Sequence, residues 1–367
     1  MRAHTLLPVV VQSIFTGLAL SDAVSDLWDN GKAALDAQLA KSSTCTRDKL
    51  MVRREWGDLT ADERKSYIKA VLCLTTSPSK LDASQYPGAK TRYDDFVAVH
   101  INQTMSIHGT GNFLSWHRYF TWAYENALRN ECGYTGSQPY WNWGKWADDP
   151  EKSPIFDGTD TSMSGNGEKT AHTSGFAPAG NGGGCVQSGP FKNMSVHLGP
   201  MSPAISPAPP RNPQTNGMGY NPRCLRRDIT NYLSSRYTTT QNITDLITTY
   251  KNIGPFQNAM QAAGRAMGIH AAGHFTIAGD PAGDFYVSPG DPAFWLHHAM
   301  IDRTWATWQI QDLPNRMQVI AGPRTMIGRG AVAALTDEVN LYVIADKVYE
   351  ISDLVSIVDG PFCYTYA

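Results

Sequence analysis

The residues best suited to chemistry in this sequence are histidines, and most of its ten histidines are gathered into two clusters. Three fall within eighteen residues of one another and four more within a later stretch of twenty-nine. The seven are His100, His108, His117, His270, His274, His297 and His298. A spacing of four residues, as in His270-Ala-Ala-Gly-His274, places two imidazoles on one face of a helix, as a shared metal ion requires. Taken singly, each histidine could equally be a hydrogen-bonded core residue, but two clusters together predict metal binding.

The composition of the two clusters narrows the choice of metal. One trio of imidazoles suits zinc, copper, iron or nickel, and two facing trios suit a dinuclear centre. Zinc hydrolysis needs a general base, and His270-Ala-Ala-Gly-His274 lacks the glutamate of an H-E-x-x-H motif. Carboxylates are few, with Asp291 and Asp302 flanking the His-His pair, whereas a carboxylate-bridged iron pair needs more. The all-histidine pattern favours two copper ions, since two cuprous ions can each give one electron to dioxygen.

Helical periodicity surrounds both clusters, and one mainly α-helical domain over residues 22–367 is expected, with long loops and minor strands. Thr60-Ala-Asp-Glu63 is a capping box that begins one helix. Asp291 is expected to be the N-cap of the last clear helix, with Pro292 in its first turn. The predicted helices cover residues 22–41, 60–74, 91–106, 115 onward, 228–236, 257–278 and 291–309.

Between residues 150 and 223 the helical pattern is lost, and Gly, Pro, Ser and Asn dominate. We call this stretch the excursion, and Cys185 and Cys224 could staple it to the surface. The chain has six cysteines without a C-x-x-C pair, which favours disulfides over zinc or redox chemistry. Six cysteines allow fifteen pairings, and the sequence does not choose among them. Short β-type runs, such as Leu341-Tyr-Val-Ile344, are expected after residue 317.

The N-terminus and the charge balance predict where the protein works. Residues 1–21 resemble a signal peptide, with Arg2 before an apolar stretch and small residues at Ala19-Leu20-Ser21; a buried N-terminal helix is the alternative. No other run is apolar enough to span a bilayer, so we expect a secreted protein with no membrane partner. Three sequons, at Asn102, Asn193 and Asn242, predict a glycoprotein. Lys and Arg total 31 against 33 Asp and Glu, which argues against nucleic acid as a partner. A monomer or weak dimer is expected.

Two segments resemble the copper motifs of the tyrosinase and catechol oxidase family of polyphenol oxidases, in its short secreted fungal form. His108-Gly-Thr-Gly-Asn-Phe-Leu-Ser-Trp-His-Arg118 is similar to the first motif, and Asp291-Pro-Ala-Phe-Trp-Leu-His-His-Ala-Met-Ile-Asp-Arg303 to the second. The resemblance spans about Arg92 to Gln309 and implies a four-helix bundle that houses a dicopper site. It assigns one copper (CuA) to His100, His108 and His117, and the other (CuB) to His270, His274 and His298.

The same resemblance suggests roles for the residues around the ligands. His297 is expected beside the copper ligands without binding the metal. Asp302 and Arg303 are candidates for orienting ligand imidazoles, with a helix salt bridge as the alternative. Some family members join a cysteine to the second CuA histidine by a thioether, but Ser106 stands at that position. Many carry a C-terminal domain that plugs the site, and its absence here predicts that no proteolytic activation is needed.

Substrate preference is predicted from four further positions. In the family, an asparagine after the first CuB histidine and a glutamate nine residues before it hold a water that helps to deprotonate monophenols. Here those positions are Ala271 and Gln261, neither of which can act as a base. Phe285 matches a bulky residue that shields CuA in some catechol oxidases, although ordinary loop packing would also explain it. Phe275, next to His274, is expected in the substrate pocket.

These positions favour oxidation of o-diphenols by O₂ to o-quinones, with o-aminophenols as related substrates and little monophenol hydroxylation. The partners are then a small phenolic substrate and dioxygen. Alternatives within the enzyme class are a true tyrosinase and a phenol-oxidising tailoring enzyme of secondary metabolism. A haemocyanin-like oxygen carrier and a zinc-dependent hydrolase are less favoured.

Overall fold

The chain is built mainly of helices, as shown by a computed structural model that describes residues 23–262, 266–327 and 330–367. The expected signal peptide, residues 1–21, lies outside the described residues. The helices are α1 (Ala23–Leu39), α2 (Ala61–Leu74), α3 (Arg92–Ile107), α4 (Phe113–Cys132), α5 (Asn231–Tyr237), α6 (Thr240–Thr249), α7 (Ile253–Gln261), α8 (Ile269–Ile277), α9 (Ala293–Ile310) and α10 (Leu313–Arg316). The mainly α-helical fold expected from the sequence is confirmed.

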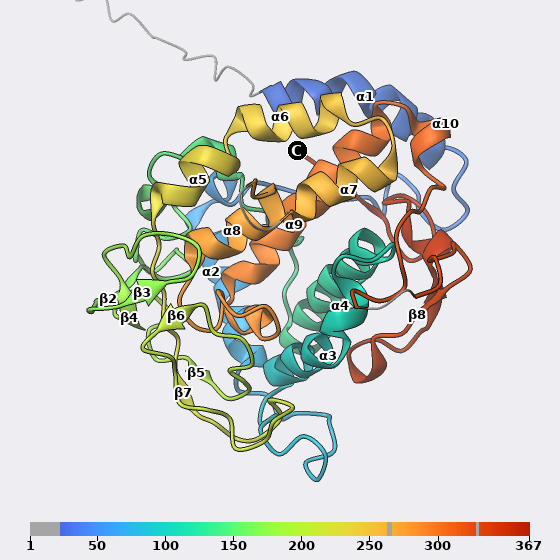
Figure 1. Cartoon of the computed structure of the whole chain (residues 1–367). Helices are drawn as coiled ribbons and strands as arrows, with labels where there is room; N and C mark the ends of the chain where they lie inside the picture. The colour runs from blue at the N-terminus through green and yellow to red at the C-terminus, as the bar shows by residue number, and fades with distance from the viewer. Residues whose placement is uncertain (1–22, 263–265, 328–329) are drawn as a thin grey trace, which may run out of the picture.

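Four of these helices, α3, α4, α8 and α9, form the bundle that carries both histidine clusters. Helix α4 packs against α3 and α9, and α8 packs against α9; Figure 1 shows α3 and α4 in teal beside α8 and α9 in orange. Every residue of α9 is buried, because α1, α6 and α10 also pack against it. The two rings of Tyr124 and Trp295 stack in parallel at 3.7 Å between α4 and α9. The apolar side chains around the His-His pair are thus explained by a helix that lies wholly in the core.

Helix ends show where local sequence signals succeeded and failed. The capping box of Thr60 and Glu63 is confirmed, and Thr91 with Asp94 forms a second one at the start of α3. Asp291, however, is not the N-cap of α9, because Pro292 occupies that position. The Asp291 carboxylate instead accepts the Ala293 backbone N–H and both arms of a buried Arg227 guanidinium.

The predicted helix over residues 257–278 is wrong in one respect, since it is two helices, α7 and α8. Helix α8 begins after Gly268, which crosses close to the end of α7. A Cβ at Gly268 would overlap the backbone carbonyls of Ala259 and Met260. The packing of one helix start on another helix end therefore breaks the continuous helical pattern.

The excursion is ordered by three small antiparallel strand pairs on one flank of the bundle (Figure 1). The pairs are β2 (Gly167–Lys169) with β4 (Gly183–Val186), β3 (Thr173–Ser174) with β6 (Ile205–Ser206), and β5 (Ser195–Val196) with β7 (Arg223–Cys224). A disulfide joins Cys185 to Cys224, as the sequence suggested. The other pairings, which the sequence left open, are Cys45–Cys363 and Cys73–Cys132.

The last fifty residues wrap the other flank and return to the N-terminal part. Strand β10 (Tyr364–Tyr366) pairs in parallel with β1 (Met51–Arg53), and β8 (Glu338–Val339) pairs with β9 (Tyr349–Glu350). The strand expected at residues 341–344 is wrong: Tyr342–Ile344 is a 3-10 turn, which Tyr342 enters with a φ of 50°. Among the described residues, no helix combines the length and apolar character that a bilayer crossing needs.

Candidate metal centre

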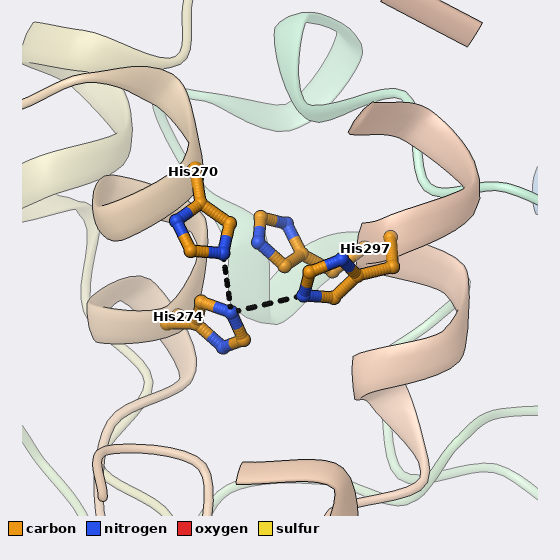
Figure 2. Close-up of side chains that lie close together, drawn as sticks. His270, His274 and His297 are labelled. Carbon is orange, nitrogen blue, oxygen red and sulfur yellow. Dashed lines mark hydrogen bonds between the residues drawn. The ribbon is translucent and has the colours of Figure 1, made fainter. Parts of the chain in front are cut away.

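Both histidine clusters meet inside the bundle as two buried groups. The first contains His100 of α3, His108 at the end of α3 and His117 of α4. The second contains His270 and His274 of α8 with His297 and His298 of α9, and Figure 2 shows the α8 rings facing the α9 side chains. Within each group, one ring nitrogen per residue lies within 4.8 Å of those of the other members. The structure therefore brings together all seven histidines selected from the sequence.

In the first group, each imidazole is fixed by a hydrogen bond from Nδ1 to a backbone carbonyl. The pairs are His100 with Tyr286 (2.7 Å), His108 with Thr104 (2.9 Å) and His117 with Phe113 (2.8 Å). Because a carbonyl only accepts, Nδ1 carries the proton in each ring, and Nε2 keeps its lone pair for a metal ion. Nε2 of His100 and Nε2 of His117 are buried without any partner in the part of the chain that the structure describes.

In the second group, three Nε2 atoms converge. The distance between Nε2 of His274 and Nε2 of His270 is 3.2 Å, and Figure 2 marks it with a dashed line. Nε2 of His298 also lies 3.2 Å from Nε2 of His274. Lone pairs that face one another at this distance repel unless a cation or a proton lies between them. The convergence of buried ring nitrogens in both groups fits a bound metal ion in each.

Burial keeps these imidazoles neutral, which a metal ligand must be. It lowers the pKa of His108 to about 4 and the pKa of His297 to about 3. Burial also lowers the pKa of the other five cluster histidines well below the ordinary value, and neighbouring imidazoles add to the effect. At neutral pH all seven rings are free of the extra proton that would compete with a metal ion.

The two groups lie directly beside each other, as a dinuclear centre requires. The rings of His117 and His298 stack at 4.6 Å between centroids, and those of His108 and His270 lie 5.9 Å apart. Two aromatic side chains not singled out from the sequence pack between the groups. Phe113 lies 4.8 Å from both His117 and His270, and Phe294 stacks on His298 at 4.1 Å. Because Phe113 and Phe294 lie within the two histidine motifs, their sequence positions could have predicted that they pack beside the metal-binding groups.

His297 packs behind the second group. Its ring stacks on His270 at 5.7 Å and lies 5.2 Å from Trp143. The ring also lies against the backbone of α8 at Gly273, where a Cβ would overlap it. Both ring nitrogens are buried, and the backbone carbonyl of His270 acts on this ring as a hydrogen-bond acceptor.

A cavity of about 290 Å³ opens onto His108, His270 and His274. All four positions considered for substrate preference line it: Gln261, Ala271, Phe275 and Phe285. The ring of Phe285 lies 4.6 Å from that of His108, which places this side chain over the first group. The Gln261 side-chain oxygen accepts the backbone N–H of Gly109 at 2.8 Å.

The cavity also contains residues that the sequence did not reveal, among them Phe176, Asp284 and Met326. Asp284 is buried, and its two oxygens accept three backbone N–H groups at 2.7–2.9 Å; the donors are Met201, Ser202 and Tyr286. Burial raises the pKa of Asp284, and these hydrogen bonds oppose the rise. Both oxygens of Asp284 are thus hydrogen-bonded to the backbone, and this carboxylate forms part of the cavity wall.

Asp302 and Arg303 do not take either of the roles expected for them. The Asp302 carboxylate binds Arg53, Arg118 and the hydroxyls of Tyr364 and Tyr366 at 2.5–3.2 Å. Arg303 donates to Ser25 and lies 5.0 Å from the Tyr140 ring centroid. Neither side chain bonds a histidine in the described structure, because backbone carbonyls already hold the rings of the first group. Asp302 instead ties α9 to the C-terminal strand.

A larger groove, of about 780 Å³, runs along α4 beside residues 342–349. Among the described residues, no histidine lines it. The larger groove is therefore not the candidate substrate site. The smaller cavity is, because it is lined by histidines of both groups.

Fold and site together define a helical protein with a dinuclear, histidine-bound metal centre. Residues 90–311 match the family model described as the common central domain of tyrosinase. Because this match covers more than half of the chain, the protein belongs to the tyrosinase family. It is a copper-dependent oxidoreductase, and its two histidine groups can bind the two copper ions of that family.

Individual relatives support this membership over nearly the whole chain. Tyrosinase P of Aspergillus terreus is 40% identical over 332 residues, which cover 86% of this chain and 91% of the relative. N-acetyl-6-hydroxytryptophan oxidase ivoB of Emericella nidulans is 38% identical over 363 residues, covering 91% and 97%. A solved structure of a polyphenol oxidase variant from Thermothelomyces thermophila is similar with a TM-score of 0.88 at 40% identity, covering 94% and 97%. The predicted family and fold are confirmed.

Proposed function

We propose that this protein is a secreted oxidase of o-diphenols, which converts catechols and related o-aminophenols to o-quinones or o-quinone imines with O₂. The observation that carries the proposal is the wall of the 290 Å³ cavity, where Phe285 covers His108 and the two positions at which the family holds its water are Gln261 and Ala271. The tyrosinase family supplies the reaction class, and the residues of this cavity supply the preference within it.

The six metal ligands that we propose are His100, His108 and His117 for one copper, and His270, His274 and His298 for the other. The unpartnered Nε2 atoms of the first group and the converging Nε2 atoms of the second support this choice. His297 is proposed not to bind copper but to fix the position of the second group, by stacking on His270 and packing against Gly273. When bound, the two copper ions supply a reversible two-electron couple that activates dioxygen.

The side chains of the cavity favour substrates that need no deprotonating base. Hydroxylation of a monophenol inserts an oxygen atom and requires a group that takes the phenolic proton. Gln261 is an amide without basic character, and Ala271 has no polar atom. Both oxygens of Asp284 already accept backbone N–H groups. A catechol carries both oxygens already, so its oxidation only removes two electrons and two protons.

The overall balance follows from this chemistry. Two catechols lose four electrons and four protons and become two quinones. One O₂ takes up these electrons and protons and becomes two waters. The protein's own contribution is to keep the imidazoles neutral and to orient a flat ring. Phe285 and Phe275 contribute aromatic surface to the cavity lining, which suits an aromatic substrate.

Secretion is part of the proposal. All six cysteines form disulfides, which persist in oxidising compartments. Because none is left over, no cysteine is available for the thioether that some relatives carry. Asn193 is exposed, whereas Asn242 is partly buried and the Asn102 amide, near the first histidine group, donates to the Tyr86 hydroxyl, so a glycan is expected first on Asn193.

The test compares two molecules that differ by one hydroxyl group, 4-methylcatechol and 4-methylphenol. Oxygen uptake is measured with protein whose copper content is known. The expected result is prompt uptake with 4-methylcatechol and at most slow uptake, after a lag, with 4-methylphenol. Prompt uptake with both would make the protein a true tyrosinase. Uptake with neither, by protein with two coppers, would overturn the diphenol oxidase proposal.

One relative supports a second candidate function, a tailoring oxidase for a single phenolic metabolite. N-acetyl-6-hydroxytryptophan oxidase, as its name states, acts on a hydroxyindole, and it matches 91% of this chain. Oxygen uptake with N-acetyl-6-hydroxytryptophan would separate the two candidates. A kcat/KM far above that of 4-methylcatechol would favour the tailoring role.

A further inference from the structure

We propose that Phe176, on the excursion, determines substrate specificity by binding an aryl substituent on the catechol ring. This inference rests on the proposed diphenol oxidase function and names the substrate class: catechols that carry a second aromatic ring para to one hydroxyl. The feature behind it is a wall of two stacked phenylalanines at the cavity, one from α8 and one from the excursion.

The wall is formed by Phe176 and Phe275. Their ring centroids lie 3.9 Å apart at an interplanar angle of 26°, and both side chains line the 290 Å³ cavity. Phe275 directly follows His274, so the wall begins one residue from a proposed copper ligand. Phe285, over His108, lies on the wall of the same cavity.

The loop that carries Phe176 is held in place by its neighbours. Strand β3 pairs with β6 just before it, and the Gly175 N–H donates to the Ala204 carbonyl at 2.9 Å. On the other side, Ala177 packs against a small apolar cluster that includes Ala271, and Phe275 packs against the same cluster. Phe176 is therefore presented to the cavity by anchored backbone on both sides.

Phe176 is nevertheless 42% exposed, although large apolar side chains are normally covered. Stacking on Phe275 uses one part of its surface and leaves the rest available at the cavity. A single catechol ring that reaches the histidines fills only part of a 290 Å³ cavity. A second aromatic ring attached to it would extend along the wall and gain stacking contacts with Phe176.

The experiment measures kcat/KM of the copper-loaded protein for catechol and for 4-phenylcatechol. We expect Phe176→Ala to lower the ratio of 4-phenylcatechol to catechol by about two- to tenfold, the range given by loss of one aromatic contact. The value for catechol alone should fall by less than the value for 4-phenylcatechol, because catechol has no second ring to stack on Phe176. Phe176→Tyr keeps the ring and should keep the ratio. Tyr220→Ala is the matched control, because Tyr220 is another exposed aromatic of the excursion and does not line the cavity.

A second measurement does not depend on turnover. Benzoic acid and 4-phenylbenzoic acid have no catechol to oxidise, and their dissociation constants from the copper-loaded protein, measured by isothermal titration calorimetry, report binding alone. The wild type should bind the phenyl derivative more tightly, and Phe176→Ala should lose that preference by the same two- to tenfold. An unchanged preference in Phe176→Ala, or an equal loss for both acids, would overturn the role of Phe176. If the wild type oxidises no catechol while the binding preference follows Phe176, the proposed function fails and the binding wall stands.

Discussion

The imidazole of His297 rests on the backbone of Gly273, and there is no room between them for a Cβ atom. This contact sets how closely α9 approaches α8 at the level of the second histidine group. Since His270, His274 and His298 sit on these same two helices, the Gly273–His297 contact also sets the spacing of three proposed copper ligands.

Gly273→Ala should therefore damage the second copper site. The added methyl group would overlap a ring that is fully buried against Trp143 and cannot swing away. We expect a loss of about 1–3 kcal/mol in unfolding free energy, and a copper content that falls towards one per chain. Urea denaturation and elemental analysis measure the two effects.

Gly254→Ala is the matched control, because Gly254 lies in α7 and its Cβ would meet only the Ala321 methyl, at 3.3 Å. It should leave copper content unchanged. A Gly273→Ala protein that retains two coppers and wild-type stability would refute the role of the contact.

Restoring the polar pair at positions 261 and 271 should restore monophenol activity. Gln261→Glu combined with Ala271→Asn places a carboxylate and an amide in the cavity beside His270. We expect the rate ratio of 4-methylphenol to 4-methylcatechol to rise by at least about tenfold, in line with the lower end of general-base contributions. The single variant Gln261→Leu serves as the control and should not raise it. No change in the double variant, with copper content intact, would mean that the missing base is not what limits monophenols.

Asp302→Asn should destabilise the protein strongly while leaving the histidines in place. Burial raises the pKa of Asp302, but Arg118, Arg53 and two tyrosine hydroxyls outweigh it and lower that pKa. The amide would leave buried arginine charge uncompensated, at a cost of about 3–5 kcal/mol. Chemical denaturation measures the loss, with the exposed Asp346→Asn as control.

The same carboxylate gives a pH dependence of known sign. Because the folded-state pKa of Asp302 is below the unfolded value of about 3.9, its stabilisation is present above pH ~4 and is lost as the pH falls through the folded value. Below pH ~4, the unfolding free energy of the wild type should fall steeply with decreasing pH, and that of Asp302→Asn should fall less steeply. If Asp302→Asn lost copper but kept stability, Asp302 would be a ligand-orienting residue after all.

His172 should make the excursion more stable in mild acid. Its Nε2 contacts the Asp228 carboxylate at 2.7 Å and its Nδ1 the Thr170 carbonyl at 2.9 Å, so both nitrogens donate when the ring is charged. Burial lowers the pKa of His172, and Arg226 adds to this, but the two hydrogen bonds and the Asp228 charge raise it overall. The stabilisation is full below pH ~6.5 and is lost as the pH rises through the raised value.

Hydrogen exchange of residues 167–186 measures this effect. Protection should be greater at pH 5.5 than at pH 8 after correction for intrinsic exchange rates. His172→Gln should remove the difference, while exchange in α9 stays unchanged in both proteins. Equal corrected protection at both pH values in the wild type would contradict a charged His172.

The sequence was informative where local pattern and chemistry coincide. The capping box at Thr60 and the His270–His274 pair follow from spacing within one element, and each histidine cluster falls within a short stretch of sequence. Gln261 and Phe285 were also placed in the substrate cavity from their distance to a motif histidine.

The features that were missed depend on contacts between distant segments. Phe176 reaches Phe275 because the short strands β3 and β6 hold its loop, and strands of two residues leave no periodicity to detect. The partners of Asp302 come from β1, α4 and β10, which are all distant in sequence. Residue spacing alone therefore could not show that Asp302 binds these side chains and not a histidine. The break between α7 and α8 likewise arises from helix packing at Gly268.

The most direct test of the dicopper diphenol oxidase is a combined measurement of metal content and oxygen consumption on one preparation with catechol. The account predicts two copper ions per chain and one O₂ consumed for every two catechols oxidised. Zinc in place of copper in active protein, or two coppers with no oxygen uptake from catechol, would contradict it.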